Sequence, residues 1–182
     1  CGTVRAFARY AAGEAAAGRD GEAATVWLGE VITIVSGVGA SFVANLARLS
    51  LATNTARRGD PRRALAHYPV IVQEWRRGGQ WAQQWITLRT LVPVLVHVGA
   101  LEEAAVVLGG LRRHGQADAW GSDAEGLGAS DERLRHGLGE AYEVHVTRGS
   151  ALTPVELVRF AEEASAVGAG LDAVQLGVEA AR

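Results

Sequence analysis

Lysine and methionine are both absent from this 182-residue sequence, and cysteine occurs only once, as Cys1. All 18 basic residues are therefore arginines. Without lysine the chain cannot form a Schiff base with a substrate, and it cannot supply the lysine of a Walker A phosphate-binding loop. A single cysteine excludes an internal disulfide and a metal cluster held by cysteines.

Long apolar runs are missing as well, and none approaches the length that spans a membrane. The single cysteine is compatible with a reducing cytosol, and the missing apolar runs give no membrane span. We therefore expect a cytoplasmic protein with no membrane partner. The formal net charge of −2 gives no overall attraction to nucleic acid. We expect no direct contact with DNA, despite the arginines at 57–58 and 62–63. Because the chain begins with cysteine and lacks methionine, we take it to be part of a longer protein.

The main positive feature is a repeat. A glycine recurs about every 40 residues, and each is followed five residues later by alanine and nine residues later by a large apolar residue. The three copies are Gly18, Ala23 and Trp27, then Gly59, Ala64 and Tyr68, then Gly99, Ala104 and Leu108. This periodicity is typical of a scaffold built from similar helical units rather than of a catalytic motif.

Apolar residues at helical spacing predict three helix pairs. The pairs cover residues 4–17 with 22–36, 41–58 with 61–77, and 80–98 with 101–114. Asp60 as N-cap and Pro61 as first helical residue are a typical helix start. Pro69 and Pro93 fall inside predicted helices, where each removes a backbone donor, so each predicts a kink or, alternatively, a break.

The C-terminal part lacks the repeat. Its glycine-rich residues 116–129 show no periodicity and predict a loop. A helix is expected from Ser130 to about residue 147, and "TPVE" at 153–156 is a capping box that starts a helix reaching about Ala166. Residues 171–182 predict one more helix. The expected fold is all-α, with helical-hairpin repeats in 1–115, a glycine-rich loop in 116–129 and a helical cap in 130–182.

The glycine, alanine and aromatic spacing within a helical hairpin resembles the tetratricopeptide signature, although this repeat is longer than the usual 34 residues. The segments "LGGLRRHG", "LRHGLGEAY" and "RGSALTPVELVRFAEEA" resemble the C-terminal regions of actinobacterial signalling ATPases. These include LuxR-type transcriptional regulators and proteins linked to nucleotide cyclases. The resemblance implies a solenoid of helix pairs that acts as a non-catalytic arm, with no cofactor in this fragment.

In a tetratricopeptide array the first helix of each pair lines the concave surface, which implies a groove formed by 4–17, 41–58 and 80–98. The expected groove residues are Arg5, Arg9, Asn45, Leu49, Thr53, Gln83 and Arg89. Arginine in such a groove can hold a carboxylate or phosphate through paired hydrogen bonds. The alternative for each arginine is an ordinary solvated surface residue, and Leu49 also belongs to the apolar stripe of its helix.

Other candidate residues have an ordinary structural interpretation. Trp75, Trp81 and Trp85 could line a site for a peptide or flat ligand, but tryptophan more often fills a core. His136 and Glu140 share a helical spacing without a third ligand, so we expect no metal site. The sequence displays no close cluster of titratable residues of the kind that catalysis needs. We therefore expect no enzyme activity.

The sequence therefore predicts the protein- or ligand-binding sensor arm of a bacterial transcriptional or signalling regulator. Its partner would be a protein, a peptide or a nucleotide-switch domain of the same chain. One alternative is self-association through the uncovered end of the array, giving a homo-oligomer. The other is a small helical enzyme with its site near residues 115–145.

Overall fold

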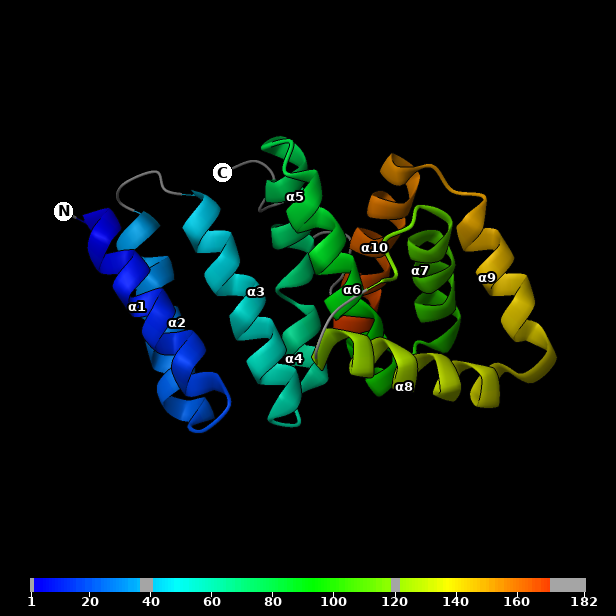
Figure 1. The fold of residues 1–182 in the computed structure, drawn as a ribbon, viewed down its shortest axis with the longest axis horizontal. Helices are drawn as coiled ribbons and strands as arrows, with labels where there is room; N and C mark the ends of the chain where they lie inside the picture. Colours follow the sequence, from blue (N-terminus) through cyan, green and yellow to red (C-terminus); the bar gives the residue numbers. More distant parts are fainter. Residues whose placement is uncertain (1, 37–40, 119–121, 171–182) are drawn as a thin grey trace.

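The computed structural model describes residues 2–36, 41–118 and 122–170, and all regular secondary structure in these residues is helical (Figure 1). The all-α prediction is confirmed. The helices are α1 (Gly2–Ala17), α2 (Gly21–Ser36), α3 (Ser41–Arg57), α4 (Pro61–Leu65), α5 (Tyr68–Arg77), α6 (Trp81–Val98), α7 (Leu101–Arg113), α8 (Ser122–Leu138), a short 3-10 helix (Gly139–Ala141), α9 (Tyr142–Ser150) and α10 (Pro154–Ala169). The helix expected at 171–182 lies outside the described residues.

The repeat corresponds to a period of helix starts. Asp20 and Asp60 cap α2 and α4 through their carboxylates, and Ala100 is the N-cap residue of α7. The fourth and eighth residues after each cap are buried, namely Ala24 and Leu28, Ala64 and Tyr68, and Ala104 and Leu108. The sequence prediction of Ala23 and Trp27 for the first copy is therefore wrong by one residue, because the N-cap and not the glycine sets the helix phase.

Two of the repeated glycines end helices. Gly59 and Gly99 follow α3 and α6 with φ of 90° and 85°, a left-handed conformation that only glycine adopts without strain. Each lets the chain reverse and start the second helix of its pair. In the second and third copies, the repeated glycine therefore lies just after the end of the first helix of the pair.

The two prolines have different effects. The helix predicted at 61–77 is two helices, since α4 ends at Leu65 and α5 begins at Tyr68 with Pro69 in its first turn. Pro93 lies within α6, which continues from Trp81 to Val98. The expected break therefore occurs only at the first proline, where a missing backbone N–H is harmless because the first turn of a helix needs no such donor.

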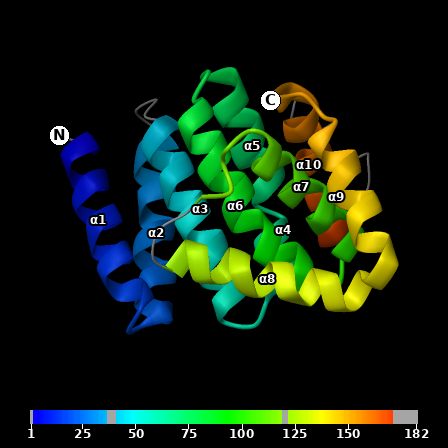
Figure 2. The same ribbon diagram turned by 45° about the vertical axis from the view of Figure 1, so that its right-hand side comes forward.

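Neighbouring helices pack side by side from α1 at one end of the molecule to α9 at the other (Figure 1). A small core lies among α1, α2 and α3, and a larger one extends from α3 to α10. The last helix, α10, packs against α4, α5, α6 and α7. Figure 2 shows α8 running across the ends of the other helices, in contact with α6 and α7.

The predicted C-terminal organisation is partly wrong. Residues 122–129, expected in the loop 116–129, form the first half of α8. The single helix expected from Ser130 to 147 is interrupted at Gly139, whose φ of 53° ends α8 before α9 begins. Burial of Leu127 against the main core compensates for the low helix propensity of the neighbouring glycines.

The closest helix contact joins α7 and α9. A Cβ atom on Gly109 would lie 2.1 Å from the Val146 carbonyl oxygen, and one on Gly149 would lie 1.9 Å from the Val106 carbonyl oxygen. Both distances are far shorter than van der Waals contact. The two backbones therefore touch directly, which requires glycine on both helices.

Replacing Gly149 with alanine is expected to force α9 away from α7 and to lower the free energy of unfolding by about 3 kcal/mol. The matched control is Gly128→Ala in α8, where an added Cβ meets nothing within 4 Å. That change is expected to stabilise the protein by about 0.5–1 kcal/mol because alanine favours the helix. Urea unfolding of both variants measures the difference, and equal effects would contradict the close contact.

Candidate ligand-binding cavity

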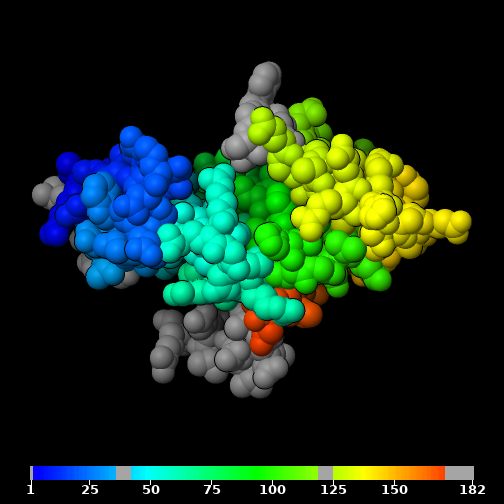
Figure 3. All heavy atoms as spheres, turned by 90° about the horizontal axis from the view of Figure 1, so that it is seen from below, coloured from blue at the N-terminus to red at the C-terminus, as the bar shows by residue number. Residues whose placement is uncertain are grey.

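A cavity of about 280 Å³ lies between α3, α6 and α8. Its described lining residues are Thr53, Ala56 and Arg57 from α3, Arg89, Thr90, Pro93, Val94 and His97 from α6, and Gly126 from α8. Figure 3 shows this region as a hollow in which α6 is visible between α3 and the start of α8. We call this space the central cavity.

Several lining residues lie four positions apart on their helix and therefore face the same side. Arg89, Pro93 and His97 follow one another at intervals of four along α6, so they share one face of that helix. Thr53 and Arg57 have the same spacing on α3. Gly126 is the only described contribution of α8, and a Cβ placed there would lie 3.7 Å from the Pro93 ring. The central cavity thus needs residues from two successive helix pairs and from the C-terminal part.

The structure brings together two of the seven expected groove residues. Thr53 and Arg89 both line the central cavity. Gln83 is half-buried on α6 outside it, with its carbonyl accepting a hydrogen bond from the Thr87 hydroxyl. Of the three helices expected to line a groove, α3 and α6 contribute to the cavity and α1 contributes no described residue. Individual positions differ from the expectation because the face of each helix depends on its packing.

The other four expected groove residues do not line the cavity. Leu49 belongs to the main core, and Asn45 is buried with its side-chain oxygen accepting a hydrogen bond from Arg48. Arg5 is exposed on α1, and Arg9 pairs with Glu30 at 2.9 Å. The arginines of α1 therefore have the ordinary surface role that was the alternative interpretation.

The charge of the central cavity is one-sided. None of its described lining residues is acidic, whereas Arg57, Arg89 and His97 are basic. The ion pairs recorded among the described residues include none of these three side chains. Arg57 and His97 are exposed, and Arg89 is half-buried. An anion entering the cavity would therefore meet positive charge without a competing carboxylate from the described lining.

Arg89 has an unusual set of contacts. Its Nη1 atom donates to the Gln116 carbonyl oxygen at 3.2 Å, which fixes the end of the side chain. Its Nε atom is buried and has no hydrogen-bond partner among the described residues. The Nε atom itself has almost no accessible surface, so it is not a contact for a ligand in this structure. The basic residues of the lining, with no acidic residue among the described ones, make the cavity a candidate site.

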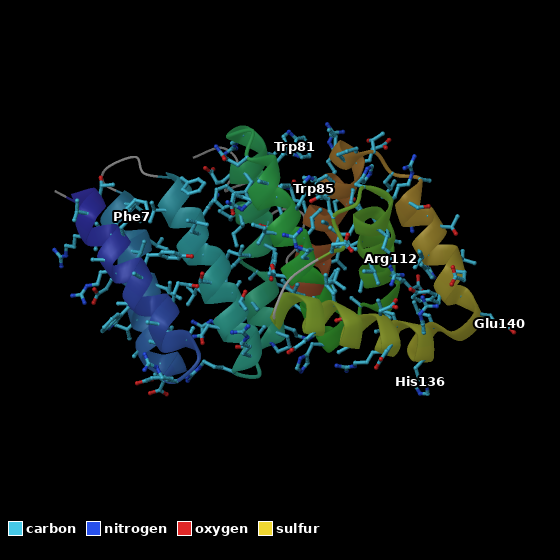
Figure 4. The ribbon with its side chains drawn as sticks, viewed as in Figure 1. Phe7, Trp81, Trp85, Arg112, His136 and Glu140 are labelled. Atoms are coloured by element: carbon cyan, nitrogen blue, oxygen red, sulfur yellow. The ribbon has the colours of Figure 1, made fainter. Side chains whose placement is uncertain are left out.

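The tryptophans separate into two environments. Trp75 is buried, donates from Nε1 to the Thr87 hydroxyl at 3.1 Å and packs edge-on against Phe42. Trp81 and Trp85 lie on the outer part of α6, with ring centroids 6.2 Å apart (Figure 4). Trp75 and Trp81 share the lining of a small pocket between α5, α6 and α10, and none of the three rings lines the central cavity.

A second polar cluster, missed in the sequence, joins α7, α8 and α9. Arg112 donates to the Tyr142 hydroxyl at 2.6 Å and pairs with Asp131 at 2.9 Å, and the Tyr142 hydroxyl donates to the same carboxylate. Arg135 also pairs with Asp131 at 3.2 Å. Figure 4 marks Arg112 at this junction. We call these four residues the Asp131 cluster. Asp131 and Arg135 share α8 at the i,i+4 spacing, whereas Arg112 and Tyr142 come from other helices, so local spacing could indicate only that one pair.

The pKa shifts in the Asp131 cluster follow from its contacts. Burial alone would raise the pKa of Asp131, but hydrogen bonds from Tyr142 and Arg112 and the positive charge of Arg112 lower it below its ordinary value. Burial and the hydrogen bond to Asp131 raise the pKa of Tyr142. The cluster therefore holds Asp131 ionised and Tyr142 protonated, which suits a fixed structural link between helices.

No group of three histidine, cysteine or acidic side chains suited to a metal ion is found in the described parts of the chain. His136 and Glu140 project from the outer end of the molecule (Figure 4). Within 2–36, 41–118 and 122–170, no helix is both long and apolar enough to cross a membrane. The chain matches no protein-family model, no curated protein and no solved structure, so similarity assigns no residue to a function.

The Asp131 cluster predicts a pH-dependent contribution to stability. The folded pKa lies below the ordinary value of 3.8, so the contribution is complete above that pH and disappears as pH falls through the folded pKa. Asp131→Asn is expected to cost about 1 kcal/mol at pH 6, since the pairs are partly exposed. Urea unfolding between pH 6 and 2.5 should show this difference shrinking below pH 3.8.

The control for that series is Asp118→Asn, which removes an exposed acid with no recorded ion pair. Its effect is expected to be small at every pH. A cost of Asp131→Asn that stays constant down to pH 2.5 would contradict the assigned ionisation.

Proposed function

We propose that this chain is a non-catalytic sensor arm of a bacterial signalling or transcriptional regulator, and that it binds a small ligand in the central cavity. The observation that carries the proposal is the meeting of Thr53 and Arg89 in one cavity with a one-sided charge. Both residues belong to the first helices of successive pairs. These are the helices that line the concave surface in the tetratricopeptide arrays that the sequence resembles.

The helical repeat supports an array as the framework of the sensor. Helix caps at Asp20, Asp60 and Ala100 recur at a constant interval, and each is followed by a buried alanine and a buried large residue. Each pair thus presents a similar packing surface to the next. In such an array a change in the distance between two pairs alters the curvature of the whole.

The position of the cavity gives binding a route to the rest of the protein. A ligand between α3 and α6 would contact two successive pairs, and Gly126 adds α8 to the same site. Binding would therefore favour one spacing of the pairs and one position of α8. A ligand that prefers one arrangement shifts the population toward it, and a partner domain would detect that shift.

Self-association is the second candidate, and one observation favours it. Val4 and Phe7 on α1 and Val26 on α2 are exposed apolar residues, with exposed fractions of 70%, 48% and 58%. They lie on the first helix pair, and Figure 4 shows Phe7 at that end of the molecule. A molar mass that rises with protein concentration in the absence of ligand would favour this candidate.

A helical enzyme with a site near 115–145 has less support. The Asp131 cluster is a group of titratable residues in that region, but its members bond to one another, and Tyr142 is buried. A catalytic group must reach its substrate. We therefore assign the cluster to structure and the central cavity to function.

The proposal predicts that filling the cavity abolishes ligand binding. Ala56→Phe places a ring in the cavity, whereas Ala82→Phe adds the same ring at an exposed position of α6 outside it. A thermal-shift screen with amino acids, organic acids, nucleotides and short peptides should give ligands that stabilise the wild type and Ala82→Phe. These ligands should not stabilise Ala56→Phe. Ligands unaffected by Ala56→Phe, or no ligand at all, would contradict the proposal.

A further inference from the structure

From the contacts of Arg89 we propose that the central cavity controls the connection between α7 and α8. We call residues 114–118 of this connection the strap. Arg89 lines the central cavity and also bonds the strap, so that an occupied cavity holds the strap more firmly. This inference rests on the proposed function, because it concerns the same cavity. It adds how an occupant of that cavity acts on another part of the chain.

The strap leaves the end of α7 and lies against α6 (Figure 1). It begins at His114, whose ring faces Trp85 of α6 with the ring centroids 5.6 Å apart. The Nε2 atom of His114 donates to the Leu152 carbonyl oxygen at 3.0 Å, in the turn between α9 and α10. These contacts fix the first residue of the strap, and neither Trp85 nor Leu152 belongs to the described lining of the cavity.

The middle of the strap is held from α6 as well. The Gln116 carbonyl oxygen accepts a hydrogen bond from Arg89 Nη1 at 3.2 Å. The Gln116 amide donates to the Leu111 carbonyl oxygen at 2.8 Å, and Ala117 packs against the main core. Among these residues, Arg89 is the one that lines the central cavity in the described part of the chain. The cavity therefore meets the strap through the Arg89 side chain.

Arg89 is also the part of the cavity wall that can yield. Among the described lining residues that are not exposed, it alone has a long side chain, whereas the others are alanine, threonine, proline, valine and glycine. Because Arg89 borders the cavity, rotamers that leave Gln116 can enter that space. An empty cavity thus offers the guanidinium alternatives to its bond with the strap.

An occupant of the cavity removes those alternatives. The Arg89 side chain then has fewer rotamers away from Gln116, so forming the bond costs less conformational entropy. The population shifts toward the firmly held strap, and by linkage a held strap favours an occupied cavity to the same extent. Gly115 and Asp118 are exposed, so a partner domain can contact the strap and detect the change.

Hydrogen exchange of the Gln116 amide measures how firmly the strap is held, because this amide bonds the Leu111 carbonyl oxygen. On the complete 182-residue chain, Arg89→Met removes the guanidinium and keeps an apolar stem. Exchange at Gln116 is expected to become about tenfold faster, since one hydrogen bond of the strap is lost. Arg57→Met is the matched control, because Arg57 lines the cavity without a recorded bond to the strap, and it should leave this exchange unchanged.

Side chains that fill the cavity serve as the probe in place of an unidentified ligand. Ala56→Phe and Thr53→Phe each add a ring from α3, whereas Ala8→Phe adds one at an exposed position of α1. Exchange at Gln116 is expected to become several times slower in the first two variants and to stay unchanged in the third. In the Arg89→Met background, Ala56→Phe should no longer slow this exchange, because the link is missing.

Three results would overturn the inference. Unchanged exchange in Arg89→Met would show that the Arg89 bond does not hold the strap. Unchanged or faster exchange in the filled variants that fold would leave Arg89 as an ordinary clamp on a connecting segment. Equal slowing with and without Arg89 would place the coupling in other residues. Because none of these measurements uses a ligand, the ligand screen of the proposed function can succeed when the coupling fails, and the reverse.

Discussion

The close contact of α7 with α9 is the constraint on which the C-terminal part of the structure depends. Gly109 and Gly149 let two backbones touch, and this fixes α9 against the last repeat. Tyr142, the first residue of α9, then bonds the Asp131 carboxylate of α8, and Arg112 of α7 bonds both. This chain of contacts helps to hold α8, which also packs directly against α6 and α7. Because α8 carries Gly126, the third wall of the central cavity depends on both sets of contacts.

The three walls of the central cavity are held in place by different contacts. The α3 and α6 walls belong to helices packed in the main core, whereas the described start of α8 meets them through Gly126 and Leu127. The packing of Leu127 and Leu134 in the main core holds α8 in place together with the Asp131 cluster. A ligand that contacts α3, α6 and Gly126 would stabilise the start of α8 in the position that its far end already favours. A ligand shifts such an equilibrium only by the difference in its affinity for the two arrangements.

The sequence could predict what local chemistry decides. Asp60 with Pro61 and Thr153 with Glu156 marked helix starts correctly, because caps depend on residues within one turn. The role of a glycine, in contrast, could not be predicted from its neighbours in sequence. Gly13 is buried in α1, where a Cβ would lie 2.8 Å from Leu28, and Gly126 lies inside α8. A glycine that allows close packing and a glycine that ends a helix look alike in sequence, and only the tertiary contact distinguishes them.

The same limit applies to the candidate site. The repeat spacing predicted one surface on residues 4–17, 41–58 and 80–98, yet α1 contributes no described residue to the cavity, and Leu49 and Asn45 are buried. The facing of a helix is set by which stripe its neighbours cover, and α10 and α8 cover α6 from elements distant in the sequence. His97 and Arg57 were missed for this reason, since they enter the cavity only after Gly126 closes its third side. Arg89 was identifiable as a basic residue, but the position of its side chain depends on the Gln116 carbonyl, which no repeat relates to it. The shape and charge of the central cavity thus depend on contacts between helices that are distant in the sequence.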